Sequence, residues 1–442
     1  MRHLSRRRAL AIVAALPVTL ACGAADTPVP TVPATKPATP TVATAPTSTR
    51  VPVLQATPTT APVPPTATRP PAPTSTVAPS PDLLMTTPDF CIHVFLWGGF
   101  ETTRRDVAMV REMGFRWVKQ RFEWRYIEPH EKGKFEWNEP DRIVAAISSA
   151  GLKVIARIDN QPRWARSDPT WPIDGPPDRM GDFGDFLRAL ATRYRGKIQA
   201  YQIWNEPNLA REWGNKPPDP RQYVEMLKVA HAAVKAADPG AIVISGGLSP
   251  TTASGAIAMP DVGFVKQMYA AGGRAYFDML GVHAAGFKAP PEASPAEIAQ
   301  NPAFNHGEGA AGRIYGFRHA EDLRAVMVEN GDANKRVAVL EFGWTSDDRP
   351  NSLYRWHAVT EQEKAAYLVR AYDWAYANWR PWIGLMSVIY IADPAWTRDH
   401  EQFHWAVTGP DGSKRAAYDS LAKMVKRSEP APLRLAGAAG SP

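Results

Sequence analysis

The chain has 442 residues, and neither its 43 prolines nor its formal charge of +7 is spread evenly along it. Sixteen prolines lie between residues 27 and 81. Residues 1–82 hold seven basic and two acidic side chains, a net +5 that leaves +2 for the remainder. A nearly neutral remainder without a basic cluster binds phosphate groups poorly. The composition therefore argues against a nucleic-acid-binding protein.

The first 22 residues resemble an export signal. Arg2 and residues 6–8 form a positive region, and residues 9–20 form an apolar run that is too short to span a bilayer. The stretch "SRRRAL" loosely resembles a twin-arginine signal, so the Sec and the twin-arginine routes both stay open. Either route would carry the rest of the chain out of the cytoplasm.

The apolar run ends in "TLAC", which resembles a lipobox with Cys22 as the lipidated residue. An ordinary signal cleaved between residues 21 and 25 is the alternative, and it would release a soluble product. We therefore expect an exported protein that is lipid-anchored through Cys22 at the outer face of the cell membrane, or otherwise secreted.

Residues 23–82 consist mostly of Pro, Thr, Ala and Val, a composition that cannot bury enough apolar surface to offset its ordering entropy. This predicts a disordered, partly polyproline-II linker. The composition becomes globular from Leu83 onward. We expect four parts: an export signal at 1–22, the linker at 23–82, one folded domain at 83–430 and a flexible tail at 431–442.

Short apolar runs alternate with amphipathic segments through the folded part, as in repeated βα units around a parallel sheet. The runs predict eight strands at 90–97, 115–122, 152–158, 198–204, 241–247, 277–283, 336–342 and 383–391. The amphipathic segments predict helices at 104–113, 141–151, 183–194, 223–234, 262–271, 320–329, 368–379 and 416–425. Eight strand–helix pairs predict an α/β fold, a single (β/α)8 TIM barrel.

Cysteine and histidine usage points away from metals and disulfides. Cys91 is the only cysteine besides Cys22, and its apolar neighbours indicate a buried small side chain. There is no cluster of Cys and His at metal-ligand spacing and no HExxH motif. We expect neither a catalytic metal nor a cofactor.

In such barrels the reactive groups lie where the strands end at the carboxyl face. Glu206 ends the fourth predicted strand and Glu341 the seventh, so the two lie across the bore from each other. Cleavage of a glycosidic bond requires two carboxyl groups, one protonated and one ionised. Further candidates for sugar contacts at the strand ends are Asn205, His283, His93, Lys119, Arg121, Trp97 and Trp344.

The motifs "WNEPN" (204–208) and "LEFGW" (340–344) resemble clan A of the glycoside hydrolases, which are retaining (β/α)8 barrels. Within this clan the chain looks most similar to the group around family 39, the β-xylosidase and α-L-iduronidase relatives. The stretches that carry the resemblance are 115–156, 198–214, 277–286, 336–348 and 403–424.

The resemblance implies a role for each matching residue. Glu206 would be the acid/base and Glu341 the nucleophile, and Asn205 would bind the 2-hydroxyl of the sugar. A covalent glycosyl-enzyme intermediate and a carboxyl separation of roughly 5–5.5 Å would follow. Two positions depart from the pattern: Lys119 replaces the usual Arg, and Ala285 stands where the relatives often carry a Tyr.

The leading hypothesis is therefore a retaining glycosidase that acts on carbohydrate, on β-linked or related plant or microbial glycans. A surface carbohydrate-binding barrel whose catalysis has decayed is an alternative, motivated by the two departures. A transglycosylase is a third, because it shares the covalent intermediate. The sequence does not distinguish exo from endo action.

Overall fold

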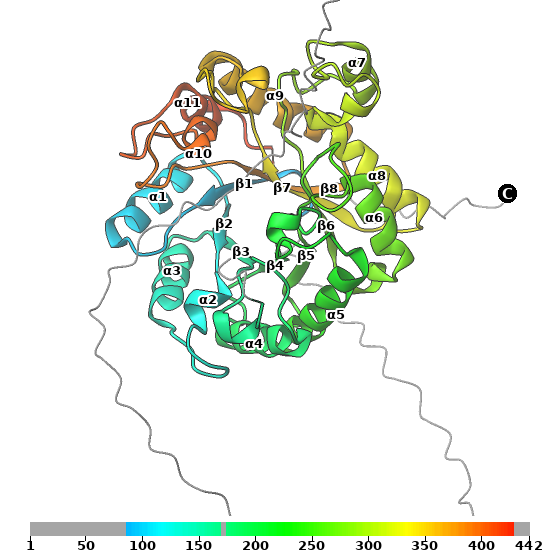
Figure 1. Ribbon diagram of the computed structural model, residues 1–442. Helices are drawn as coiled ribbons and strands as arrows, with labels where there is room; N and C mark the ends of the chain where they lie inside the picture. The colour runs from blue at the N-terminus through cyan, green and yellow to red at the C-terminus, as the bar shows by residue number, and fades with distance from the viewer. Residues whose placement is uncertain (1–84, 169–173, 428–442) are drawn as a thin grey trace, which may run out of the picture. The chain divides into compact units, whose positions relative to one another are not determined.

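The computed structural model describes residues 85–168 and 174–427, in which eight parallel strands close into a barrel in the order β1 to β8. Figure 1 looks down this barrel, with the helices arranged around the strands. The predicted TIM barrel is confirmed. The predicted export signal, Cys22, the linker and the tail lie outside the described residues.

Each predicted strand is present, and most are shorter than predicted at one or both ends. The strands are β1 (Asp89–Val94), β2 (Trp117–Arg121), β3 (Lys153–Ile158), β4 (Ala200–Ile203), β5 (Ile242–Ser245), β6 (Met279–His283), β7 (Arg336–Phe342) and β8 (Ile383–Val388).

Eight helices follow the strands and form the outer layer. They are α1 (Phe100–Glu112), α3 (Asn138–Ser149), α4 (Met180–Arg193), α5 (Pro220–Ala237), α6 (Asp261–Ala270), α8 (Ala320–Glu329), α9 (Glu361–Asn378) and α11 (Ala416–Lys423). Three short helices that the periodicity did not predict lie in the connections: α2 (Trp124–Ile127), α7 (Pro295–Gln300) and α10 (Glu401–Trp405).

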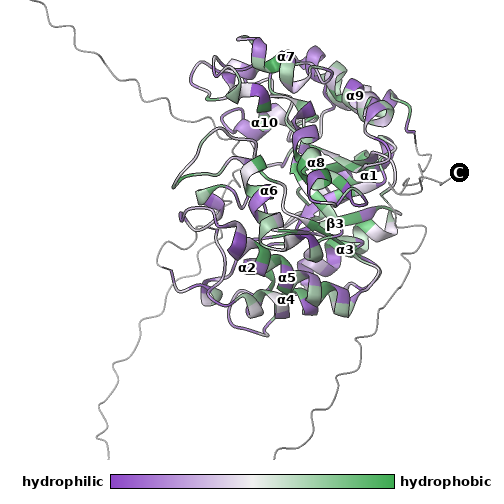
Figure 2. Cartoon of the chain, turned by 90° about the vertical axis from the view of Figure 1, so that its right-hand side faces the viewer, coloured by the Kyte–Doolittle hydropathy of each residue, from purple (hydrophilic) through white to green (hydrophobic). Residues whose placement is uncertain are grey.

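The core has two layers. A large cluster of buried apolar side chains fills the space between strands and helices, and a smaller one fills one end of the bore. In Figure 2 helices such as α4 and α5 show hydrophilic and hydrophobic residues side by side, as expected for helices with one buried face. Among the described helices, none is both long and apolar enough to cross a membrane.

Side chains of alternate strand residues share the bore, because successive side chains of a strand point to opposite faces. On β2, Trp117 belongs to the apolar cluster in the bore, and Lys119 lies one step nearer the carboxyl end. On β3, Ile155 and Arg157 repeat this order. The bore is therefore apolar at the amino end and polar at the carboxyl end.

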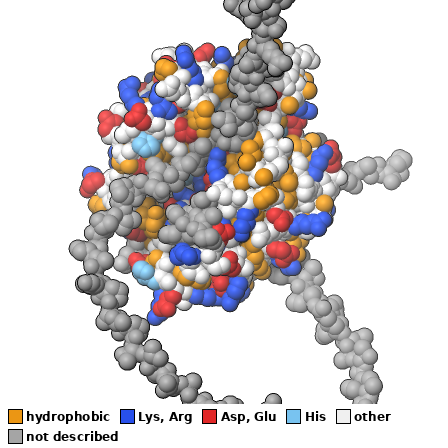
Figure 3. All heavy atoms as spheres, viewed as in Figure 1, with side chains coloured by type: hydrophobic (Ala, Val, Ile, Leu, Met, Phe, Trp, Pro, Cys, Tyr) orange, Lys and Arg blue, Asp and Glu red, His pale blue; other side chains and the backbone are white. Residues whose placement is uncertain are grey.

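The surface carries charges of both signs. On the face that Figure 3 shows, basic and acidic side chains are interspersed with apolar ones.

Candidate active site

Glu206 lies directly after β4, in a backbone that leaves the strand abruptly. Trp204 and Glu206 both have positive φ angles, 65° and 44°, a conformation that costs a non-glycine residue of the order of 1–3 kcal/mol. The turn is held by hydrogen bonds from the Glu206 amide to the carbonyl of Gly247 (2.9 Å) and from the Trp204 indole N–H to the carbonyl of Glu212 (2.8 Å). In this turn the Glu206 carboxylate contacts His283, the last residue of β6.

Glu341 reaches the bore because of an irregularity in β7. Ala338 and Leu340 belong to the apolar cluster inside the bore, so strict alternation would place Glu341 outside and Phe342 inside. Phe342 belongs instead to the cluster outside the bore, so the alternation breaks after Leu340. The register of β7 shifts here against both neighbouring strands. A bulge of this kind re-aims a side chain, and Glu341 therefore faces the bore beside Leu340.

One histidine joins the two carboxylates. His283 Nδ1, at the end of β6, lies 3.2 Å from Glu206 Oε1 and 3.8 Å from Glu341 Oε2. The two distances sum to 7.0 Å, which is the upper limit for the separation of these oxygens. The sequence-predicted residues Glu206, Glu341 and His283 thus occupy one site.

Cationic groups surround Glu341. Lys119 Nζ lies 2.8 Å from Oε1 and also donates to the carbonyl of Leu340 (3.0 Å), and Arg157 lies 3.7 Å from the same carboxylate oxygen. His93 Nδ1 is 3.9 Å away. Lys119 and His93, both predicted as sugar-binding residues, are therefore placed against the predicted nucleophile.

These neighbours decide the ionisation of Glu341. Burial by itself would raise its pKa, but Lys119 above all, followed by His283 and Arg157, holds the pKa well below its usual range. Burial and the charge of Lys119 lower the pKa of His93 well below its usual value. The carboxylate is thus ionised near neutral pH beside an uncharged His93.

Glu206 has a different environment. Arg211, from the loop after β4, lies 2.8 Å from Oε2 of Glu206, while His283 contacts Oε1. The next residue, Glu212, is also buried, and its Oε1 lies 3.4 Å from Nε of Arg211. Burial raises the pKa of Glu212 to about 7. Three ionisable groups from one short loop therefore share this side of the site.

Asn205 offers an unused donor. Its Oδ1 accepts a hydrogen bond from Gln202 (3.1 Å), and within the described part of the chain its buried Nδ2 has no hydrogen-bond partner. Buried polar atoms are rarely left unpaired. An amide donor in this position can bind a sugar hydroxyl.

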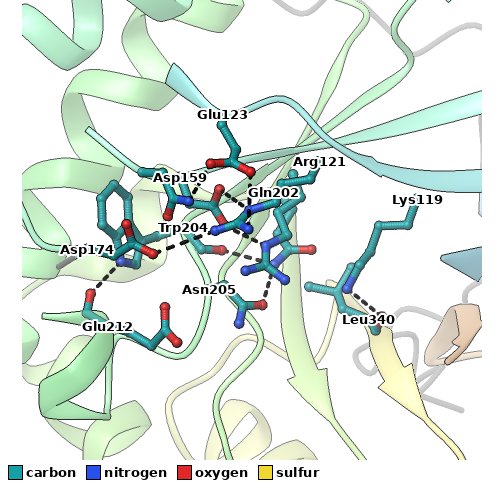
Figure 4. A network of polar contacts seen from close by, with 12 residues as sticks. Lys119, Arg121, Glu123, Asp159, Asp174, Gln202, Trp204, Asn205, Glu212 and Leu340 are labelled. Atoms are coloured by element: carbon teal, nitrogen blue, oxygen red, sulfur yellow. Dashed lines mark hydrogen bonds and ion pairs between the residues drawn. The ribbon is translucent and has the colours of Figure 1, made fainter. Parts of the chain in front are cut away.

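Arg121 lies in a separate network, shown in Figure 4 together with Lys119. Its guanidinium lies 2.9 Å from Asp159, 3.2 Å from Glu123 and 3.6 Å from Asp174. The predicted contact of Arg121 with sugar remains a prediction. Its link to the carboxylates is indirect and runs through Asp159, which also pairs with Arg157 (2.5 Å).

The aromatic candidates differ from each other. Trp344 is fully buried, its indole N–H donates to the carbonyl of Ala289 (2.9 Å), and its ring lies against Gly286, where an added Cβ would come within 1.8 Å of the indole. The role of Trp344 as a sugar platform remains a prediction. Trp97 is partly exposed and lies 5.9 Å from the ring of Tyr126, so its role remains a prediction.

An aromatic group that was not among the predicted site residues lies next to His93. The rings of Tyr390 and Phe95 lie 5.5 and 4.7 Å from the His93 ring, and Trp396 packs against both. These rings come from the ends of β1 and β8. They are the better candidates for an apolar sugar surface.

Sequence analysis also missed Arg157 and Arg211. Arg157 carried a signal, because it is a charged residue within an apolar strand, and a residue two positions before Asp159 should point to the same face as Asp159. Arg211 carried none, since its contact with Glu206 depends on the path of the loop after β4. In residues 85–168 and 174–427 no group of His, Cys, Asp and Glu has the arrangement of a metal site.

The chain matches the family model of cellulase (glycosyl hydrolase family 5), a clan A family, over residues 80–271, which include Glu206 and end before Glu341. None of the curated proteins compared with the chain matches it significantly in sequence. The resemblance to clan A is confirmed by the family match and by the fold.

Solved structures show the same fold. A family 39 glycoside hydrolase from Bacteroides cellulosilyticus WH2 is 20% identical over 76% of this chain, with a TM-score of 0.56, and the chain spans 63% of its length. GH5_18 from Streptomyces cattleya, solved in complex with GlcNAc, is 13% identical, with a TM-score of 0.54; the match covers 76% of this chain and 79% of that one. A glucosidase from Croceicoccus marinus is 14% identical over 72% of this chain and 62% of its own, with a TM-score of 0.50. At these identities the likeness shows a shared (β/α)8 fold.

Proposed function

We propose that the protein is a retaining glycosidase that hydrolyses O-glycosidic bonds of poly- or oligosaccharides by double displacement. The observation that carries the proposal is the meeting of Glu206 and Glu341 at His283, with oxygens at most 7.0 Å apart. Retaining enzymes hold their two carboxyls roughly 5–5.5 Å apart and inverting ones roughly 6.5–9.5 Å apart. The upper limit of 7.0 Å on the distance between these two oxygens excludes most of the carboxyl separations found in inverting enzymes.

In the first step Glu341 attacks the anomeric carbon while the bond from that carbon to the leaving oxygen breaks. The leaving oxygen takes the electron pair of that bond and a proton from Glu206. The low pKa of Glu341 supplies the ionised nucleophile. Asn205 Nδ2 is available to bind the sugar hydroxyl next to the reacting carbon.

In the second step a water molecule attacks the anomeric carbon and gives a proton to Glu206. The bond between Glu341 and the sugar breaks, and its electron pair returns to the carboxylate. Glu206 therefore acts as acid in one step and as base in the other. Lys119 stabilises Glu341 as its negative charge returns, since the two groups lie 2.8 Å apart.

A panel of aryl glycosides tests the proposal. We expect turnover by the wild type, a loss of roughly 100- to 10,000-fold in Glu206→Gln on substrates with poor leaving groups, and no turnover in Glu341→Gln. A 2-fluoro sugar with an activated leaving group should label Glu341, and mass spectrometry of the peptides locates the label. Sugar binding without any turnover in the wild type would favour the decayed binding barrel.

Transglycosylation is a further outcome of the same assay. If an added acceptor sugar takes the glycosyl group in preference to water, the protein is a transglycosylase, and the covalent intermediate is unchanged.

We further propose that the chain is exported and held at the outer face of the cell membrane through a lipid on Cys22. The basic, apolar and "TLAC" segments of residues 1–22 support this proposal.

A further inference from the structure

Two aromatic side chains lie at the carboxyl rim of the barrel, outside the aromatic group next to His93. Trp97 follows β1 by three residues, and Tyr126 belongs to α2, which follows β2. Their ring centroids are 5.9 Å apart and their planes are tilted by 36°. Trp97 is partly exposed and Tyr126 is 40% exposed. These two residues, the rim pair, therefore present apolar ring surface to solvent.

The rim pair continues the aromatic surface beside the reacting groups. Phe95, whose ring lies 4.7 Å from that of His93, precedes Trp97 by two residues. Two residues span at most about 7 Å of chain, which is of the order of the length of one pyranose unit. A sugar chain that rests on Phe95 can therefore reach Trp97 with its next unit.

A row of ion pairs leads from the predicted nucleophile towards the rim pair. Arg157 lies 3.7 Å from Glu341 and 2.5 Å from Asp159. Asp159 lies 2.9 Å from Arg121, and Arg121 lies 3.2 Å from Glu123. Figure 4 shows the last three of these residues beside one another. The row therefore begins on the side of the site that holds the nucleophile.

The row of ion pairs ends beside Tyr126. Arg125 lies 2.9 Å from Glu123 and 3.2 Å from Asp174, and its guanidinium lies 5.8 Å from the centre of the Tyr126 ring. The side chains of Arg125, Glu123 and Asp174 are 14%, 15% and 18% exposed. They can therefore form hydrogen bonds with the hydroxyl groups of a sugar whose apolar face lies on the rim pair.

The position of the rim pair decides which part of a substrate it meets. In the proposed reaction the sugar that becomes attached to Glu341 is retained, and the group that is protonated by Glu206 leaves. The row of ion pairs begins at Glu341, and His93, 3.9 Å from Glu341, stacks with Phe95. The rim pair therefore lies on the side of the retained sugar.

We propose that Trp97 and Tyr126 form a second sugar subsite, which binds the unit next to the retained sugar on its non-reducing side. The inference rests on the proposed function and names its substrate class. This class is an oligosaccharide or polysaccharide with at least two sugar units before the cleaved bond. Hydrolysis then releases products longer than a monosaccharide.

Pairs of 4-nitrophenyl glycosides test the inference. Each pair consists of a monosaccharide and its β-1,4-linked disaccharide: glucose and cellobiose, xylose and xylobiose, or mannose and mannobiose. In the pair that the wild type hydrolyses, kcat/KM should be at least about tenfold higher for the disaccharide, because only the disaccharide reaches the rim pair. Chromatography should show that the disaccharide is released intact together with nitrophenol.

Variants of the rim pair should reduce this preference. Trp97→Ala should raise KM more than it changes kcat for the disaccharide glycoside, and the tenfold ratio of the two kcat/KM values should fall towards one. Tyr126→Ala should lower the ratio in the same direction, and Trp97→Phe, which keeps a ring, should retain most of it. Trp382→Ala is the matched control, because Trp382 is also partly exposed but precedes β8, at the amino end of the barrel. It should leave the ratio unchanged.

The outcomes separate the inference from the proposed function. If the wild type hydrolyses no member of any pair, the proposed function fails. If the wild type hydrolyses a monosaccharide glycoside as well as its disaccharide, or first removes a single sugar from the disaccharide glycoside, the proposed function stands and the inference is wrong. Equal losses of kcat/KM on both substrates in Trp97→Ala would show a merely structural role and would also overturn it.

Discussion

Lys119 is the residue on which the ionisation of Glu341 depends most. Both side chains are buried, and the Nζ–Oε1 distance of 2.8 Å makes this a tight ion pair. In a buried pair, removal of one partner leaves an uncompensated charge, which destabilises a protein by roughly 3–5 kcal/mol. Through this one contact Lys119 thus stabilises both the fold and the ionised form of Glu341, the proposed nucleophile.

Lys119→Met tests this dependence. Without the cation, burial dominates and the pKa of Glu341 rises, so the acidic fall of kcat/KM should move up by about one pH unit or more. In the wild type the low folded pKa contributes to stability above the ordinary glutamate value of 4.5, and this contribution is lost as the pH falls through the folded pKa. The free energy of unfolding above pH 5 should therefore drop in the variant.

Lys119→Arg is the control for charge, because it keeps the cation but changes the donor geometry. In this variant the acidic fall of kcat/KM for an aryl glycoside should occur at the same pH as in the wild type. An unchanged acidic limb in Lys119→Met, with full activity, would show that Arg157 and His283 alone keep Glu341 ionised.

The sequence predicted the two carboxylates from motifs at strand ends, but it did not predict how Glu341 is aimed. Strict alternation along β7 from Leu340 would have turned Glu341 away from the bore, and only the register shift against β6 and β8 places it inside. Trp344 is a second case, since the sequence did not predict that its indole ring packs against Gly286, in the segment after β6. Both depend on contacts between distant segments, which a local pattern does not contain.

At the scale of elements, the end of β4 is fixed by a residue of α5. The Tyr223 hydroxyl donates to the carbonyl of Ile203 (2.8 Å) and accepts from the amide of Gly246 (2.6 Å). It therefore joins the last residue of β4 to the segment after β5, directly before the strained turn that carries Glu206. The helix therefore positions Glu206, the proposed acid/base, through this hydroxyl.

Tyr223→Phe should therefore affect both stability and turnover. The buried carbonyl and amide lose a partner, which costs about 1–3 kcal/mol, and the turn at Glu206 loosens, so kcat should fall more than KM changes. Thermal unfolding and steady-state kinetics with an aryl glycoside measure the two effects.

Tyr372→Phe is the matched control for the Tyr223 variant. Tyr372 of α9 donates to the carbonyl of Met386 within β8 (2.8 Å), two residues before the strand ends. The Tyr372→Phe variant should lower the melting temperature, but it should reduce kcat less than Tyr223→Phe does. Equal effects of the two variants on kcat would show that Tyr223 has no special role at Glu206.

The elements themselves were largely predictable, because eight apolar runs alternate with eight amphipathic stripes. The errors have physical causes. The first and last strands were predicted too long, since apolar residues such as Phe95 and Tyr390 continue past the last ladder pairs into the loops. The helices α7 and α10, of six and five residues, are too short to show a helical period.

At the scale of the whole molecule, the barrel separates stability from chemistry. The apolar cluster at one end of the bore stabilises the fold, and the charged groups gather at the other. The strand and helix elements of the described residues run from β1 to α11, and residues 83–430 are the range that the composition predicts for the folded domain. This domain should therefore need neither the leader nor the Pro/Thr-rich segment to fold.

A truncated chain of residues 83–430 tests this separation together with the proposed anchor. It should unfold cooperatively and keep the kcat/KM of the full chain on a soluble aryl glycoside within about twofold, because the catalytic groups and their partners lie inside it. In cells, the full chain should fractionate with membranes, and Cys22→Ser should release the activity into the soluble exported fraction, because a cysteine acylated after cleavage of the leader is the expected attachment. If Cys22→Ser and the wild type distribute identically between membrane and soluble fractions, the lipid anchor is wrong. The kcat/KM of the truncated chain tests the folded domain independently of that result, because turnover of a soluble glycoside does not depend on the membrane anchor.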